Sequence, residues 1–410
     1  MKKRSEIEEK DKWDLSGYFK DDAEFLNEFN YLKTQTDFLA GYRGKLKDEK
    51  TILECLERDQ EISKRLEVLY VYAVLKTRED AGNSLYQERQ TQVGTLISQF
   101  STKSAFVNVE IKKNPNSLLK KLGENSQFKN YFKDILRNKK HILSEKEERI
   151  LSMSSDMASG FSDNFDLFND ADLKFPKVYD SKRKAHELNH SNYMQLMQSK
   201  DRTLRKNTLK TLNGEYGKFN NFLASNYISE IKSNVFYARA SRYKNCLDKS
   251  IFLEEADRRV YDKLIACVNE NLDVIYNYYD LKKKSQNLPN FAIYDQFAPE
   301  KEVEKKYSFD EAFEIVKKAT KPLGEEYSKI LDLAKTQRWI DKYPNKNKDS
   351  GAFSWGAYGK NPVLLLNFVG NTQSLFTLAH ELGHSMHTYF SNKSQNYDQA
   401  GYKIFVAEVA

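Results

Sequence analysis

The chain has 410 residues, which is enough for one large domain or several smaller ones with a substantial core. Glycine (16) and proline (7) are scarce and charged residues make up 30%, a composition typical of long amphipathic helices joined by few turns. The net charge of +7 is spread over interleaved acids and bases, which indicates a solvated helical surface and argues against a nucleic-acid-binding protein.

Cysteine usage and the N-terminal sequence favour a cytoplasmic protein. Cys55, Cys246 and Cys267 have no paired spacing, so we interpret them as reduced thiols. The first ten residues carry basic side chains without the apolar segment of a signal peptide. No apolar run approaches the length of a membrane span. We therefore expect a cytoplasmic location and no membrane partner.

The first third of the sequence predicts antiparallel helices. Their spacing and breaks indicate helices over 21–42, 48–78 and 83–113, and further helices over 117–165. The region 193–285 is also helical and rich in aromatic residues, and two shorter helices are expected over 308–318 and 322–336. Residues 341–360 form a glycine-containing segment that we expect to be a mobile loop, followed by an apolar strand over 362–369.

A first His-Glu-x-x-His match, His186 to His190, lies in a segment with a strand-like pattern over 173–188. If residues 183–188 are extended, the two histidines lie about 13 Å apart at ~3.3 Å per residue, too far to share one metal ion. The preceding residues have no apolar face, and 189–192 resembles a helix cap. The sequence therefore predicts a small hairpin here and no metal site.

The second match, His380-Glu381-x-x-His384, lies on a predicted amphipathic helix. One face of this helix is apolar, with the helical spacing i, i+3, i+4, i+7 and i+11: Leu375, Leu378, Ala379, Leu382 and Met386. The two histidines fall off that face and are one turn apart, so both imidazoles can reach one metal ion. Glu381 is then held beside the metal, where it can accept a proton from water.

A catalytic zinc site needs a third protein ligand. His387 is close in sequence but lies about 10 Å along the helix axis from His380, at 1.5 Å rise per residue, so it is poorly placed. Asp398 and Glu408 are the remaining downstream candidates. Glu408 is the stronger one because it interrupts an apolar helical run, where a carboxylate is costly unless it is paired or bound.

Several of these segments resemble oligoendopeptidase F, a member of the thimet-oligopeptidase-like zinc metallopeptidases. The specific similarity is confined to about 351–410, and weaker similar pieces occur at Trp13-Asp-Leu15, Asp201-Arg202 and Tyr294-Asp295. The segments that carry the resemblance are Gly351-Ala-Phe-Ser354, Tyr358-Gly359, Pro362 to Asn367, Phe376 to His387 and Ile404 to Ala410.

This resemblance implies one zinc ion bound by His380, His384 and Glu408, with Glu381 as the general base. It also implies a mainly α, multi-helix fold with a small hairpin or sheet near the active site and a deep channel for short peptides. We expect three regions: 1–115, helical; 116–192, helical with a hairpin; and 193–410, the catalytic domain. Family members continue past the third ligand, so we expect a truncated C-terminus, with the oxyanion-stabilising residues beyond Ala410.

The expected function is zinc-dependent hydrolysis of short oligopeptides. The strand before the metal helix can offer an edge to an extended peptide, although an ordinary buried strand is equally compatible. We expect substrate contacts from Leu365, Asn367, Tyr358 and His387. Two alternatives remain open: a zinc peptidyl-dipeptidase of the same superfamily, and an inactive helical binding or scaffold fragment. The sequence does not predict the oligomeric state.

Overall fold

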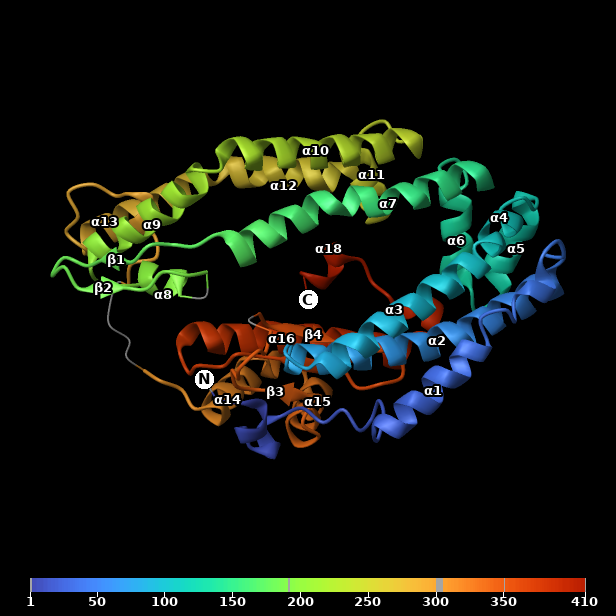
Figure 1. Ribbon diagram of the computed structural model, residues 1–410, viewed down its shortest axis with the longest axis horizontal. Helices are drawn as coiled ribbons and strands as arrows, with labels where there is room; N and C mark the ends of the chain where they lie inside the picture. Colours follow the sequence, from blue (N-terminus) through green and yellow to red (C-terminus); the bar gives the residue numbers. More distant parts are fainter. Residues whose placement is uncertain (1, 191, 300–304, 350, 410) are drawn as a thin grey trace. The chain divides into compact units, whose positions relative to one another are not determined.

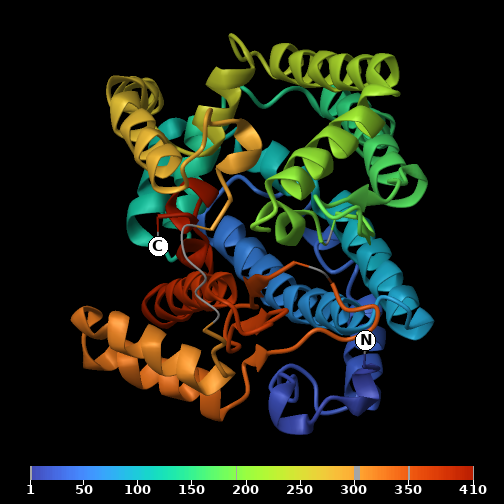
Figure 2. The same ribbon diagram turned by 90° about the vertical axis from the view of Figure 1, so that its left-hand side faces the viewer.

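The computed structural model describes residues 2–190, 192–299, 305–349 and 351–409. The chain divides into two compact units: Met1–Lys140 together with Lys305–Ala410, and His141–Glu304. Both are built mainly from helices (Figures 1 and 2). The mainly α fold with small sheets is therefore confirmed. No helix within the described ranges is long and apolar enough to cross a membrane.

The larger unit combines helices from the two ends of the chain with one small sheet. Its N-terminal helices are α1 (Asp22–Thr34), α2 (Glu49–Glu79), α3 (Ser84–Ser104), α4 (Phe106–Ile111), α5 (Asn116–Asn125) and α6 (Lys129–Asn138). Its later elements are α14 (Phe309–Ala319), α15 (Glu325–Thr336), β3 (Ile340–Asp341), β4 (Phe353–Trp355), β5 (Val363–Leu365), α16 (Thr372–Ser394), α17 (Tyr397–Ala400) and α18 (Ile404–Ala407).

Helix α2 is the longest element of this unit and lies against α3. It begins where the side chain of Asp48 accepts a hydrogen bond from the Thr51 amide at 3.0 Å, which satisfies one of the free N–H groups of the first turn. Its core face is fully buried at Ile52, Leu69 and Leu75. This helix therefore provides a rigid wall for the larger unit, with one face in the core and another left for other contacts.

The sheet has the order β3-β5-β4, with β5 parallel to β3 and antiparallel to β4. Because successive side chains of a strand point to opposite faces, β5 contributes to two cores at once. Val363 and Leu365 pack into the core formed by α1 to α6. Leu364 and Leu366 pack into the core formed by α14, α15 and α16. This double burial explains the continuous apolar sequence of the strand.

A buried ionic network joins the N-terminal segment to the sheet. Lys348 and Asp341 both have fully buried side chains, and the Lys348 ammonium donates to Asp341 Oδ1 at 2.6 Å. It also donates to the carbonyls of Tyr343 at 2.7 Å and Leu366 at 2.5 Å. Arg4 forms a second ion pair with Asp341. All three ammonium hydrogens of Lys348 therefore have acceptors, as a buried charge requires.

The smaller unit contains most of the remaining helices and a two-stranded hairpin. Its elements are α7 (Glu145–Asp166), a π-helical turn at Leu167–Asp172, β1 (Val178–Tyr179), β2 (Ala185–His186), α8 (Tyr193–Met197), α9 (Arg202–Gly217), α10 (Asn220–Ala240), α11 (Cys246–Leu253), α12 (Arg258–Glu270) and α13 (Leu272–Ser285). The fully buried Asp295 accepts from Arg202 at 2.8 Å and Arg205 at 2.7 Å. This pair of arginines fixes the 293–295 turn to α9.

The structure corrects two expectations about local structure. The helix expected over 21–42 ends at Thr34, because the chain turns there and buries Leu39 in the core. The segment 341–360 is not simply a loop, since it contains β4 and the buried Lys348. The three expected regions with boundaries at 115 and 192 differ from the division into two compact units. Those boundaries stay predictions.

Candidate metal centre

Helix α16 positions the second His-Glu-x-x-His motif. It begins after Gly370, whose φ of +79° is unfavourable for other residues and where a Cβ atom would approach the Tyr307 carbonyl oxygen to 2.7 Å. The Asn371 side chain then caps the helix by accepting from the Ser374 amide at 2.8 Å. Leu378, Leu382 and Met386 bury one face of the helix, as the sequence predicts.

The opposite face brings the two histidines together. His380 Nε2 and His384 Nε2 lie 3.0 Å apart. Glu408 follows α18 directly, and its carboxylate oxygens lie 4.0 Å from each of these nitrogens. All three ligand atoms fall within 4.8 Å of one another, and no other group of three such side chains does so in the described part of the chain. The structure therefore brings together the three residues expected to bind the metal.

Contacts between α16 and residue 402 hold Glu408 in reach. The Thr388 and Tyr402 hydroxyl oxygens lie 2.6 Å apart, and the His387 ring stacks on Tyr402 with centroids 3.8 Å apart. His387 is not part of the metal group, and its buried Nδ1 has no hydrogen-bond partner. Burial, followed by the charge of His384, lowers the pKa of His387 and favours the neutral ring.

Asp398, the alternative third ligand, has a different role. Its carboxylate accepts hydrogen bonds from the Asn130 amide at 2.8 Å and the Tyr131 amide at 3.0 Å. These are free N–H groups at the start of α6, so Asp398 caps that helix from outside. The structure therefore favours Glu408 over Asp398 as the third metal ligand, as the sequence does.

Glu381 lies beside the metal group and against the sheet. Its side chain is buried, and the backbone amide of Ser354 in β4 faces its carboxylate. Burial is the largest effect and raises its pKa, and the nearby Glu408 raises it further, while His380 and the Ser354 amide oppose the shift. Ser354 lies in a segment that carries the family resemblance, but the sequence predicts no role for it. Its signal is a small polar residue between two aromatic ones, Phe353 and Trp355, which is typical of a short strand.

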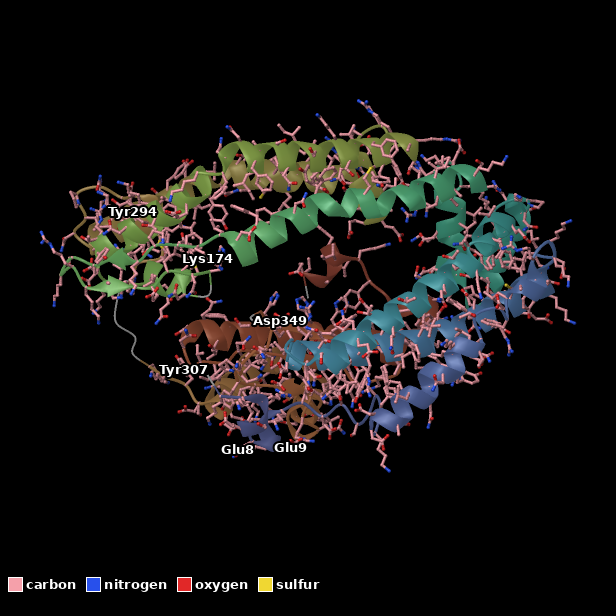
Figure 3. The ribbon with its side chains drawn as sticks, in the orientation of Figure 1. Glu8, Glu9, Lys174, Tyr294, Tyr307 and Asp349 are labelled. Carbon is pink, nitrogen blue, oxygen red and sulfur yellow. The ribbon has the colours of Figure 1, made fainter. Side chains whose placement is uncertain are left out.

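The substrate contact expected at Leu365 needs correction, whereas the one expected at Asn367 stays a prediction. Leu365 is fully buried in the central strand β5, both of whose edges are paired, so it cannot bind a peptide. The outer strands are β3 and β4, and backbone hydrogen bonds from the segment 11–14 flank β3, which leaves the outer edge of β4. Asn367 donates its amide hydrogens to the carbonyls of Asp349 and Gly351, both at 2.8 Å, so it holds this loop (Asp349 is labelled in Figure 3). The contacts expected of Tyr358 and His387 stay predictions.

The first His-Glu-x-x-His match forms no such group. His186 lies in strand β2 and contacts Asp180 at 3.0 Å, whereas His190 contacts the Asn169 carbonyl at 3.3 Å. The two imidazoles therefore have separate partners. Of the segment 183–188 predicted to be extended, Ala185–His186 forms strand β2, whereas Arg183 has a φ of 63°. Local structure, rather than the five-residue pattern, separates the two matches.

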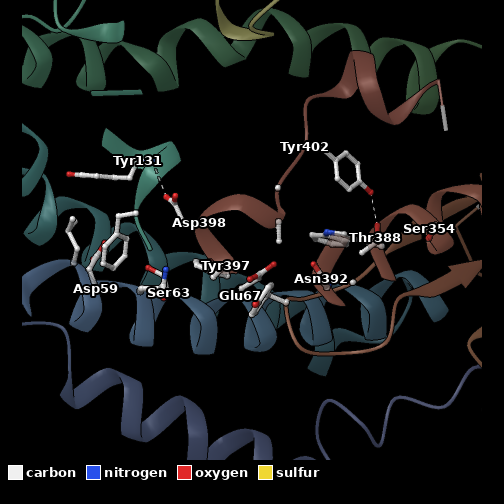
Figure 4. A pocket seen from close by; sticks show the side chains of 18 residues that line it. Asp59, Ser63, Glu67, Tyr131, Ser354, Thr388, Asn392, Tyr397, Asp398 and Tyr402 are labelled. Atoms are coloured by element: carbon white, nitrogen blue, oxygen red, sulfur yellow. Dashed lines mark hydrogen bonds between the residues drawn. The ribbon is translucent and has the colours of Figure 1, made fainter. Parts of the chain in front are cut away.

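An acidic cavity of about 590 Å³ lies beside α16 in the larger unit (Figure 4). Its walls come from α2, α6, the end of β4, α16 and the segment 397–402. Asp59, Glu67 and Asp398 all line it, and burial is the main cause of the raised pKa of each carboxyl group. The pKa of Asp59 rises to about 6. Sequence reasoning gave no indication of this cavity.

Asp59 should make stability pH-dependent. Its folded-state pKa of about 6 lies above the ~3.9 of an unfolded chain, so the stability it contributes is present below about pH 4 and is lost as the pH rises through 6. We expect Asp59→Asn to raise the free energy of unfolding by about 1–2 kcal/mol at pH 7, after allowance for solvent access, and to change it little at pH 4. Urea unfolding at both pH values measures this. A gain of equal size at both would contradict it.

A helix with His-Glu-x-x-His, joined by a carboxylate from a second helix, is the arrangement of metal-dependent peptidases. The comparisons with known proteins agree. Residues 195–410 match the model of peptidase family M3, and residues 111–175 match that of oligopeptidase F. The chain belongs to peptidase family M3. The resemblance found in the sequence is thereby confirmed.

Curated relatives align with nearly the whole chain. Oligopeptidase PepF of Bacillus subtilis is 36% identical over 99% of this chain and 62% of its own length. Group B oligopeptidase PepB of Streptococcus agalactiae is 34% identical over 99% of this chain and 69% of its own length. The chain thus spans somewhat under two thirds of the Bacillus relative. Oligoendopeptidase-F of Enterococcus faecium, a crystal structure, has a TM-score of 0.66 at 27% identity, covering 95% of this chain and 65% of its own.

Proposed function

We propose that the protein is a zinc-dependent endopeptidase that hydrolyses short oligopeptides, with Glu381 as the general base. The observation that carries this proposal is the convergence of His380, His384 and Glu408 beside Glu381. Family membership supports it, because the relatives are named as oligopeptidases.

The donor set fits zinc. Zinc binds histidine nitrogen and carboxylate oxygen at about 2.0–2.2 Å in tetrahedral geometry, which places neighbouring donor atoms roughly 3.3 Å apart. The measured separations of 3.0 Å between the two nitrogens and 4.0 Å from each to Glu408 bracket that value. Two histidines and one glutamate also leave a fourth position open, as a catalytic zinc requires.

Zinc held by these three residues would polarise the scissile carbonyl and make a water molecule more acidic. Glu381 accepts the proton of the attacking water and later gives it to the leaving amine nitrogen. The raised pKa of the Glu381 carboxyl group suits this double role, because a pKa closer to neutral pH lets the group both accept and release a proton. The Ser354 amide keeps the carboxylate oriented, and the Ser354 carbonyl on the outer edge of β4 is placed to accept a hydrogen bond from an extended peptide.

Metal removal and a matched pair of variants test this function. A chelator should abolish cleavage of a fluorogenic peptide blocked at both ends, and added zinc should restore it. The blocked peptide also separates an endopeptidase from a peptidyl-dipeptidase, which needs a free C-terminus. Glu408→Gln should lower zinc affinity by about 100-fold or more, because loss of a residue that only hydrogen-bonds to a metal ligand already costs about 10–100-fold.

Asp398→Asn is the control, since asparagine is also a good cap and this residue is not among the metal group. Elemental analysis should find about one zinc per chain in the parent and in this control. Less than about 0.1 zinc per chain in the parent after growth in zinc-replete medium would favour an inactive binding or scaffold fragment. Equal zinc affinity in the parent and in Glu408→Gln would refute the proposed ligand set.

A further inference from the structure

The acidic cavity beside α16 begins one helical turn from the metal group. Thr388 lines the cavity and lies four residues after His384, about 6 Å along the helix axis at 1.5 Å per residue. Ser354, which faces Glu381, lines the same cavity. An extended peptide covers about 6–7 Å in two residues. When one peptide bond lies at the metal group, the side chain two or three residues further along the peptide therefore reaches this cavity.

Two carboxyl groups on α2 give the cavity its chemistry. Asp59, Ser63 and Glu67 follow one another at intervals of four residues, so they lie on one face of the helix and line the cavity together. Asp59 forms no hydrogen bond or ion pair with any described residue. Glu67 Oε2 is fully buried and lacks a hydrogen-bond partner among the described residues. A buried oxygen atom of this kind is destabilising unless something binds it. Asp59 is partly buried.

The protein's own cations do not neutralise these carboxylates. The Lys64 ammonium lies 5.3 Å from the ring centroids of both Tyr358 and Tyr397. Within the described ranges, neither Asp59 nor Glu67 forms an ion pair with a lysine or arginine. Asp398 is occupied by the amides of α6. Asp59 and one oxygen of Glu67 are therefore the groups in this cavity that lack a cationic partner among the described residues.

The aromatic walls favour the same kind of ligand. Tyr131, Tyr358 and Tyr397 line the cavity (Figure 4 labels Tyr131 and Tyr397). The rings of Tyr358 and Tyr397 already accept one cation, because the Lys64 ammonium lies 5.3 Å from both ring centroids. A guanidinium or ammonium group binds aromatic faces and makes charge-assisted hydrogen bonds to carboxylates. An apolar side chain would fill the space but leave Asp59 without a partner. The volume of about 590 Å³ is ample for a long side chain.

The chain direction of β4 indicates which part of a bound peptide lies next to the cavity. Ser354 is the residue of β4 whose backbone groups face away from β5, and because its amide faces Glu381, the outer edge offers a peptide the Ser354 carbonyl. Antiparallel pairing is slightly more stable per residue than parallel pairing. A peptide antiparallel to β4 has its N-terminal part next to the end of β4, where Trp355, Gly356 and Tyr358 line the cavity. Given the proposed function, we propose that this cavity is the subsite for a lysine or arginine side chain two or three residues before the scissile bond.

The test compares peptides that differ only in charge. Blocked peptides carry arginine or its neutral analogue citrulline at the second and third positions before the scissile bond. We expect kcat/KM to favour arginine by about 10-fold or more, as one charge-assisted hydrogen bond of 1.5–3 kcal/mol would give. In Asp59→Asn/Glu67→Gln the preference should fall to within about twofold, while cleavage of the citrulline peptide persists. Glu57→Gln, an exposed glutamate on the same helix, should retain the parent preference.

Binding measurements separate this inference from the proposed function. Peptide affinity of the zinc-loaded Glu381→Gln variant, by fluorescence anisotropy, should show the same arginine preference without cleavage. If the parent cleaves no peptide but the binding preference is present, the proposed function fails and the subsite stands. Equal use of both peptides by the parent would overturn the subsite, as would a preference that survives in the double variant. A preference for arginine only after the scissile bond would overturn its assigned side. Should the double variant not fold, Asp59→Asn alone, expected to be more stable at pH 7, provides the comparison.

Discussion

Replacement of Glu381 with glutamine is expected to lower peptide hydrolysis by about 10²–10⁴-fold while the protein keeps its zinc. Glutamine has nearly the same shape and can still face the Ser354 amide, but it cannot accept the proton of the attacking water. The metal ligands are untouched, because Glu381 is not among the three converging side chains. Single-turnover cleavage of a blocked peptide, with zinc content measured on the same sample, provides the measurement.

Glu325→Gln is a suitable control, since that glutamate is exposed at the start of α15 and lines no site described above. It should leave both zinc content and cleavage at the parent level. If Glu381→Gln retained activity within threefold of the parent, the general base would have to be another group. Joint loss of zinc and activity would instead indicate that Glu381 supports the metal group directly.

Replacement of Lys348 with methionine is expected to lower the free energy of unfolding by about 3–5 kcal/mol. Lys348 and Asp341 have fully buried side chains, so removal of the ammonium leaves a buried carboxylate with only Arg4 as an ionic partner. The carbonyls of Tyr343 and Leu366 also lose their donor. Urea unfolding followed by circular dichroism measures the change.

The exposed Lys346 lies in the same segment and provides the control, because Lys346→Met should change stability by less than about 0.5 kcal/mol. The double variant Asp341→Leu/Lys348→Met should be more stable than Lys348→Met alone, since no uncompensated charge remains buried. A loss below about 1 kcal/mol in Lys348→Met would show that the network contributes little to the fold.

Helix α16 could be predicted from sequence because its signals are local. The spacing of Leu378, Leu382 and Met386 defines one face, and the two histidines fall on another. Glu408 was favoured because a carboxylate in an apolar run needs a partner, and the structure places it near the histidines. Each of these inferences uses residues within one helical segment.

Features that depend on distant segments could not be predicted. Strand β5 looked like a possible edge, because its neighbours β3 and β4 are only two and three residues long and carry no clear pattern of their own. The cavity joins carboxylates of α2 to α16 and the segment 397–402, more than 300 residues further along the chain. Sequence periodicity identifies a buried face, but it does not identify what packs against it.

The discontinuity of the larger unit has a consequence for protein synthesis. Strand β5, which completes the core of α1 to α6 through Val363 and Leu365, is made only after the whole smaller unit has been translated. At roughly 5–20 residues per second, the 224 residues between the end of α6 at Asn138 and the start of β5 at Val363 take about 11–45 seconds. During that interval the nascent N-terminal helices present an incomplete apolar core to the cytosol. Chaperone occupancy should therefore be highest while ribosomes translate the smaller unit, and should fall once β5 has emerged.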